Sequence, residues 1–135
     1  MSIAVIYWSG TGNTAQMAEA VAQAADATLI EVSQVTAQQA SEYDRLALGC
    51  PAMGAEVLEE ADFEPFFTAL EPLLSGKKLA LFGSYGWGDG QWMRDWADRA
   101  AAAGAVLCAE PVIANETPDA DALAECAALG KALAQ

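Results

Sequence analysis

The stretch that decides the fold reads Ile3-Ala4-Val5-Ile6-Tyr7-Trp8-Ser9-Gly10-Thr11-Gly12-Asn13-Thr14. Its first half, residues 3–8, is a continuous apolar run, which is typical of a strand buried on both faces of a parallel sheet. Its second half is a polar loop with two glycines. Residues 14–25 then supply strong helix formers, with an apolar face that includes Met17 and Val21. The stretch therefore predicts a strand, a tight turn and a helix.

The same alternation of strand and helix patterns continues along the chain. Further strands are expected at residues 27–32, 45–49, 78–84 and 106–113, and helices at residues 62–74, 91–103 and 118–133. Thr36 and Gln39 have the spacing of a capping box that opens one more short helix. We therefore expect a single domain over residues 1–135, an α/β fold with a doubly wound, five-stranded parallel sheet and helices on both faces.

Proline sets the expected position of the last strand. Pro111 cannot donate a hydrogen bond to a neighbouring strand, so the fifth strand should lie at an edge or be interrupted there. The strand order 2-1-3-4-5 accommodates this requirement. In such a sheet, ligands bind beyond the carboxyl ends of the strands, where the strand order reverses. The loops after the first, third and fourth strands are therefore the candidates for a binding site.

Charge and composition exclude several classes of function. The chain carries 6 Lys and Arg against 19 Asp and Glu, a net charge of −13, so we expect neither nucleic acid nor a membrane surface as a partner. It contains no histidine, which excludes Ser-His and Cys-His nucleophiles and histidine metal ligands. Cys50, Cys108 and Cys126 are far apart and odd in number, as expected for reduced thiols. With no apolar run of about 18 residues and no basic leader, these features favour a cytoplasmic protein.

The loop after the first strand has the composition of an anion site. Two glycines let the backbone turn tightly, and the hydroxyl and amide side chains supply neutral donors beside the N–H groups of a helix start. No Lys or Arg precedes Arg45, so neutral groups would hold any phosphate. An ordinary glycine-rich turn is the simpler alternative. A Walker loop is excluded, because no Gly-Lys-Ser/Thr sequence follows.

A second interpretation of this loop is a dinucleotide fingerprint. Gly10, Gly12 and Ala15 satisfy the pattern G-x-G-x-x-A, and Glu31 ends the second strand where a ribose-binding acid belongs. Thr11, Asn13 and Thr14 suit a terminal phosphate better than a pyrophosphate. The chain is also too short for a separate substrate domain.

The loops after the third and fourth strands carry side chains suited to a flat ring. Met53 stands among small residues and could form an apolar wall, unless it simply packs in the core. Trp87 lies between two glycines, which offer it no packing partners, so its indole is expected to stack on a ligand. Trp92 and Trp96 are four apart on a helix and are expected in the core, as is Trp8. One phosphate loop and two ring loops predict a site for a phosphorylated aromatic cofactor.

Three motifs in register resemble the short-chain flavodoxins of anaerobic, clostridial-type bacteria. The resemblance covers essentially the whole chain, and its motifs are Ser9-Gly-Thr-Gly-Asn-Thr14, Gly49-Cys-Pro-Ala-Met-Gly54 and Leu81-Phe-Gly-Ser-Tyr-Gly-Trp-Gly-Asp-Gly90. It implies a flavodoxin-like fold and one non-covalent FMN. The cofactor-binding residues it implies are Ser9, Gly10, Thr11, Gly12, Asn13, Thr14, Pro51, Ala52, Met53, Gly54, Ala55, Glu56, Ser84, Tyr85, Gly86, Trp87, Gly88 and Asp89.

The resemblance also implies individual roles. The first loop would bind the phosphate, Met53 and Trp87 would flank the isoalloxazine, the Gly54 carbonyl would reach N5, and Glu56 would accept from N3. Backbone around Gly86 and Gly88 would serve the N1/O2 edge. Two positions depart from the family pattern. Pro51 replaces a frequent serine, and Ala55 replaces a frequent polar residue.

These features together predict an electron carrier. FMN would supply a semiquinone/hydroquinone shuttle, and the carboxylates near the second loop would disfavour negative charge on the ring and so lower its potentials. We expect a monomer that docks transiently on basic surfaces of redox enzymes, such as flavodoxin or ferredoxin reductases. The alternative is a small FMN-dependent quinone or nitro reductase, although no substrate pocket is evident. A phospho-receiver would need acids where Ser9 and Cys50 stand.

Overall fold

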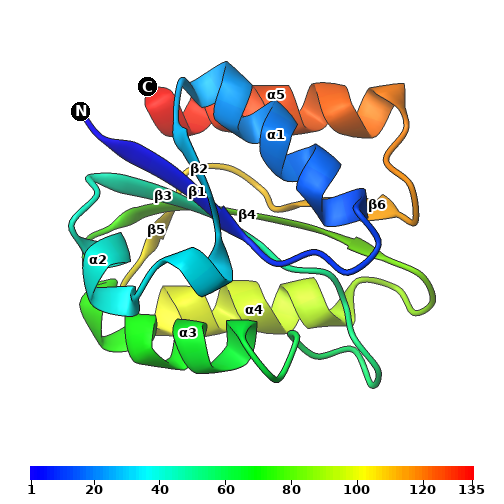
Figure 1. Ribbon diagram of the computed structural model, residues 1–135, viewed down its shortest axis with the longest axis horizontal. Coiled ribbons are helices and arrows are strands. Elements are labelled where there is room, and N and C mark those ends of the chain that lie inside the picture. Colours follow the sequence, from blue (N-terminus) through cyan, green and yellow to red (C-terminus); the bar gives the residue numbers. More distant parts are fainter.

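The computed structural model describes residues 1–135 and forms one sheet with helices on both faces (Figure 1). The strands are β1 (Ile3–Tyr7), β2 (Thr28–Glu31), β3 (Arg45–Gly49), β4 (Lys78–Tyr85), β5 (Val106–Leu107) and β6 (Val112–Asn115). The helices are α1 (Asn13–Ala25), α2 (Ala37–Ser41), α3 (Phe63–Leu70), α4 (Gln91–Ala102) and α5 (Ala120–Ala134), and the short 3-10 helices are η1 (Val32–Gln34) and η2 (Glu71–Leu73). The order of elements confirms the alternation expected from the sequence.

All strand pairs in the sheet are parallel, and the order β2-β1-β3-β4-β5 confirms the expected doubly wound topology. The reversal of strand order lies between β1 and β3, which pair along their whole length. The carboxyl ends of β1, β3 and β4 therefore meet at one edge of the sheet, at the right in Figure 1. Both chain termini lie at the opposite side.

The fifth strand is interrupted, as Pro111 requires. β5 pairs with the start of β4 and β6 pairs with its end, while residues 108–111 belong to neither strand. β6 continues to Asn115, two residues beyond the expected end of this strand. The extension has a consequence for function, because it brings the residues after β6 to the same edge as the other loops.

Local chemistry explains where α3 ends and where α2 begins. α3 ends at Leu70 and passes into η2, because Pro72 cannot continue the α-helical hydrogen bonding. The capping box before α2 is present. The backbone N–H of Gln39 donates to the Thr36 hydroxyl at 3.1 Å, and the side-chain carbonyl of Gln39 accepts from the backbone N–H of Thr36 at 3.0 Å. This confirms the motif read from the sequence.

The core is divided by the sheet. Alternate residues of β1 point to opposite faces, so Ala4 and Ile6 pack toward α3 and α4 while Ile3 and Val5 pack toward α1 and α5. Figure 1 shows these two helix layers above and below the strands. Trp92 and Trp96 are residues of α4 and their side chains are buried, which confirms their assignment to the core. No helix is both long and apolar enough to span a membrane.

Candidate functional site

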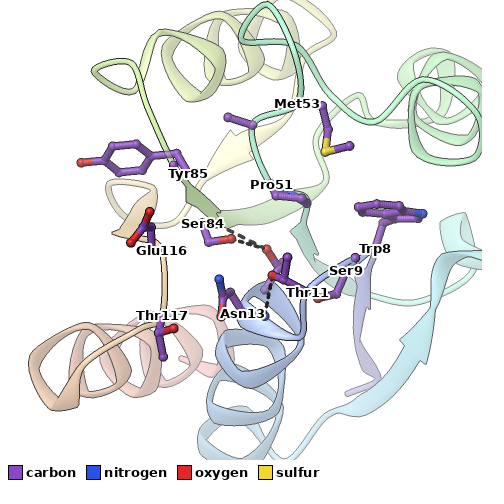
Figure 2. Close-up of a pocket in the computed structure, with 14 residues that line it drawn as sticks. Trp8, Ser9, Thr11, Asn13, Pro51, Met53, Ser84, Tyr85, Glu116 and Thr117 are labelled. Carbon is purple, nitrogen blue, oxygen red and sulfur yellow. Dashed lines mark hydrogen bonds between the residues drawn. The ribbon is translucent and has the colours of Figure 1, made fainter.

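A cavity of about 470 Å³ opens at the carboxyl edge of the sheet. Its walls come from the loops after β1, β3 and β4, the three loops that the sequence singled out, and from the loop after β6. Figure 2 shows Ser9, Thr11 and Asn13 on one side of this cavity, with Pro51 and Met53 across from them. The parallel topology thus brings together segments that are widely separated in sequence.

The first loop is held by its own hydrogen bonds. The Ser9 hydroxyl accepts the N–H groups of Gly12 at 3.1 Å and of Ala15 at 3.3 Å, so its own proton is free to donate. Gly12 has a φ of +96°, a conformation that favours glycine, and precedes α1 without a side-chain cap. The N–H groups of the first turn of α1 and the neighbouring hydroxyls can therefore donate to an anion. No Lys or Arg lines this cavity.

A buried pair of hydroxyls joins this loop to β4. The Thr14 and Ser84 hydroxyl oxygens lie 3.1 Å apart, and the Thr14 hydroxyl also accepts the Ser84 N–H at 3.4 Å. Both residues are buried and line the cavity, and Figure 2 labels Ser84 among the lining residues. The end of β4 therefore fixes the position of the helix start.

The second loop is a tight hairpin, residues 53–57. The Met53 N–H donates to the Val57 carbonyl at 2.8 Å, and the Val57 N–H donates to the Met53 carbonyl at 3.1 Å. Gly54 has a φ of +47° and Glu56 a φ of +58°, whereas Ala55 has no positive φ. The hairpin thus places its one glycine where the turn requires a left-handed conformation.

The third loop, residues 86–90, lies against this hairpin. A Cβ placed on Gly88 would collide with the Glu56 carboxylate, and Gly88 also has a φ of +91°. Glu56 Oε1 is buried and has no hydrogen-bond partner in the protein. Trp87 is 69% exposed, as expected for an indole that does not belong to the core. Asp89 forms an exposed ion pair with Arg94 at 3.0 Å.

A buried carboxylate just after the hairpin holds the start of α3. Glu59, 7% exposed, accepts N–H groups of Ala61, Asp62 and Phe63 at 2.9, 2.8 and 2.8 Å. Burial alone would raise the pKa of Glu59, but these three hydrogen bonds outweigh burial and the net pKa is lowered. Burial raises the pKa of the neighbouring Cys50 thiol to about 12, so this cysteine stays protonated and unreactive.

The structure brings most of the expected residues together. Those that line the cavity are Ser9, Gly10, Thr11, Asn13, Thr14, Pro51, Ala52, Met53, Ser84, Tyr85 and Gly86. Those that lie in the same loops but outside its lining are Gly12, Gly54, Ala55, Glu56, Trp87, Gly88 and Asp89. No group of three or more Cys, Asp and Glu side chains is arranged to hold a metal ion.

Sequence reasoning was right only in part about one tryptophan. Trp8 is expected in the core, and its half-buried side chain does pack against core residues, but it also lines the cavity beside Ser9 (Figure 2). β1 ends at Tyr7, one residue earlier than the apolar run suggested, so Trp8 already belongs to the loop. An aromatic residue at the carboxyl end of a strand next to the topological switch point was the signal available.

Sequence reasoning also missed the loop after β6. Glu116 and Thr117 line the cavity, and the Glu116 N–H donates to the Tyr85 carbonyl at 2.7 Å. The Asn115 amide donates to the Tyr85 and Gly86 carbonyls at 3.4 and 3.2 Å. These bonds hold the start of the third loop, and they arise because β6 runs parallel to β4 as far as Tyr85.

Comparison with known proteins agrees with this geometry. The family model for flavodoxin matches residues 5–130. The chain is 48% identical to a flavodoxin of Clostridium beijerinckii, over 96% of this chain and 97% of that one. It is 44% identical to a flavodoxin of Megasphaera elsdenii, over 98% of both chains. The solution structure of the two-electron-reduced Megasphaera elsdenii flavodoxin superposes with a TM-score of 0.89, at 43% identity over 98% of both chains.

Proposed function

Because the chain belongs to the flavodoxin family, whose members are small FMN-binding electron carriers, we propose that FMN occupies the cavity between its loops. The protein is an electron-transfer flavoprotein and not an enzyme with a substrate of its own. When bound, FMN supplies the electron exchange. The chain itself must bind the phosphate, orient the isoalloxazine ring and set the reduction potentials of the flavin.

The first loop is suited to the phosphate of FMN. Ser9, Thr11 and Thr14 carry hydroxyls at the cavity, Asn13 adds an amide, and the start of α1 adds backbone N–H groups with a partial positive charge. Neutral donors of this kind can hold a dianion without a cation nearby. The observation that carries the proposal is this set of neutral donors with no Lys or Arg among them, positioned where the sheet reverses its strand order.

The ring would lie between the second and third loops. One oxygen of the Glu56 carboxylate, Oε1, is buried and lacks a donor, and a flavin ring carries one N–H group, at N3, that can provide it. A Cβ built on Gly54 or Gly86 meets no atom within 4 Å, so the backbone at both positions is open to a neighbouring ring. Met53 and the exposed Trp87 are the side chains that would flank the ring and exclude water from it.

Charge supports a low potential. Negatively charged side chains close to the hairpin raise the energy of added negative charge, and Glu59 is buried where solvent screens it little. After reduction, the Gly54 carbonyl would accept a hydrogen bond from the N5–H group of the ring. We infer that the protein works as a low-potential one-electron carrier.

The partners would be redox enzymes with basic docking surfaces. Arg94 and Arg99 are the two cationic side chains of α4, and both are paired with acids: Arg94 with Asp89, and Arg99 with Glu64 and Glu71. A net charge of −13 would therefore steer the protein to positively charged surfaces, and the rate of association would fall as the salt concentration rises. Free thiols at all three cysteines support a cytoplasmic location.

The quinone or nitro reductase alternative is not favoured, because the relatives over the full length are flavodoxins. The experiment that tests the finer proposal is stepwise anaerobic reduction of the FMN-loaded protein with potentiometric control. We expect two separate one-electron steps, the second at strongly negative potential. A single two-electron step, or turnover of a quinone with a nicotinamide as donor, would refute the carrier role.

A further inference from the structure

Two buried polar side-chain atoms have no hydrogen-bond partner in the protein, Glu56 Oε1 and Trp96 Nε1. Trp96 is 1% exposed, and its ring packs edge-on against Phe63 and Phe67, with centroids 5.5 and 5.9 Å away. Trp92, one turn earlier, is equally buried but donates to the Cys50 carbonyl at 3.1 Å. An unsatisfied buried donor is costly, so the Trp96 N–H requires an explanation.

Glu56 and Trp96 line the same small cavity, of about 90 Å³, behind the hairpin and against α3 and α4. Its wall also includes Arg99, but that guanidinium already donates to Glu64 at 2.8 and 2.9 Å and to Glu71 at 3.0 and 3.4 Å. Asp95, another wall residue, accepts from Gln91 at 2.8 Å. Among the side chains of this wall, Trp96 therefore supplies the buried donor that has no partner.

The two unpartnered atoms differ in what they can do. An indole N–H only donates, and a carboxylate only accepts. A molecule that accepts from one and donates to the other satisfies both, and water is the smallest that can. A volume of about 90 Å³ is sufficient, since one water takes roughly 30 Å³ of the liquid.

We propose that this cavity binds ordered water that accepts from Trp96 Nε1–H and donates to the Glu56 carboxylate. Trp96 is then a positioning residue, which orients Glu56 toward the ring of FMN without touching the cofactor. This second step rests on the proposed contact between Glu56 and N3 of the ring. The binding of the water does not rest on that contact, because Trp96 and Glu56 are both present in the protein without FMN.

The first test is NMR on the FMN-free protein. We expect the indole N–H signal of Trp96, assigned by its loss in Trp96→Phe, to show a rotating-frame cross-peak to water and slow exchange with solvent. The Trp92 N–H, which donates to a carbonyl, is the internal control and should show no such cross-peak. Absence of the Trp96 cross-peak would overturn the proposal.

The second test separates positioning from packing. Trp96→Phe should weaken FMN about three- to tenfold, as expected for one hydrogen bond, but should leave the affinity for N3-methyl-FMN unchanged, because that flavin cannot donate to Glu56. Phe67→Leu disturbs the same aromatic cluster without removing a polar atom, and should affect both flavins equally. Equal losses for both flavins in Trp96→Phe would refute the positioning role. Equal binding of both flavins by the wild type would instead refute the contact between Glu56 and N3.

Discussion

The hydroxyl groups of Thr14 and Ser84 lie 3.1 Å apart and join the first turn of α1 to the end of β4, although the residues are 70 positions apart in sequence. The sequence predicts that Thr14 belongs to the phosphate loop. Its buried position gives the hydroxyl two roles, because an oxygen that accepts the Ser84 N–H can also donate. The pair therefore couples the position of the phosphate loop to the strand that precedes the third loop.

Thr14→Val should weaken FMN by at least about tenfold and riboflavin much less. Valine keeps the shape of threonine, and a lost hydrogen bond to a charged group costs about 1.5–3 kcal/mol. Calorimetry with both ligands measures the difference. Thr28→Val, at an exposed position of β2, is the control and should change neither affinity. Equal losses for FMN and riboflavin would show that Thr14 does not bind phosphate.

Trp87→Ala should weaken FMN several-fold to tenfold or more and restore flavin fluorescence. Aromatic stacking contributes about 0.5–1.5 kcal/mol beyond the area it buries. Because Trp87 is 69% exposed, the stability of the FMN-free protein should not change, and urea unfolding of that form provides the control. Unchanged affinity and quenching would place this indole away from the ring.

Gly54→Ala should lower the first one-electron potential of the bound FMN by some tens of millivolts. At a φ of +47° a side chain costs about 1–2 kcal/mol, and open space around the position leaves conformation as the only penalty. A tenfold change in a one-electron equilibrium corresponds to about 59 mV. Potentiometric titration of both proteins provides the measurement.

The matched control for this variant is Gly76→Ala. Gly76 has a φ of +75° and equally open surroundings, but it lies before β4, at the other end of that strand from the third loop. Gly76→Ala should lower the free energy of unfolding without changing the first one-electron potential of the bound FMN. If Gly54→Ala and the wild type have the same first potential, the hairpin backbone does not respond to reduction.

Glu59→Gln should lower the free energy of unfolding at pH 7 by about 1.5–3 kcal/mol, because three N–H groups lose a charged acceptor. The pKa of Glu59 is lowered in the folded protein. Its contribution is therefore present above the ordinary glutamate value of about 4.3 and disappears as the pH falls through the lower folded value.

Urea unfolding of the FMN-free protein from pH 7 to pH 3 measures this effect. The difference between wild type and Glu59→Gln should shrink as the pH falls below about 4.3 toward the lowered pKa of the folded protein, where the wild-type side chain also becomes neutral. Glu60→Gln changes an exposed neighbour and should cost little at any pH. A gap that persists unchanged to pH 3 would assign the loss to packing rather than to charge.

The sequence alone determined the layered α/β architecture and the three loops of the site. Continuous apolar runs identified the strands, because strands covered on both faces must be apolar throughout. Glycines next to hydroxyl and amide side chains marked the phosphate loop, and Pro111 predicted the break in the edge strand. These are local properties, set by backbone sterics and by the requirement to bury apolar surface.

Only the tertiary structure decided which segments meet. Trp8 lines the cavity as well as packing against the core because β1 ends one residue early. Glu116 reaches the cavity because β6 pairs with β4 as far as Tyr85. The contact of Glu56 with Gly88 and the unpartnered Trp96 N–H likewise depend on how separate elements pack. Strand registers and side-chain partners of this kind result from the whole chain minimising its free energy together, so no local pattern encodes them.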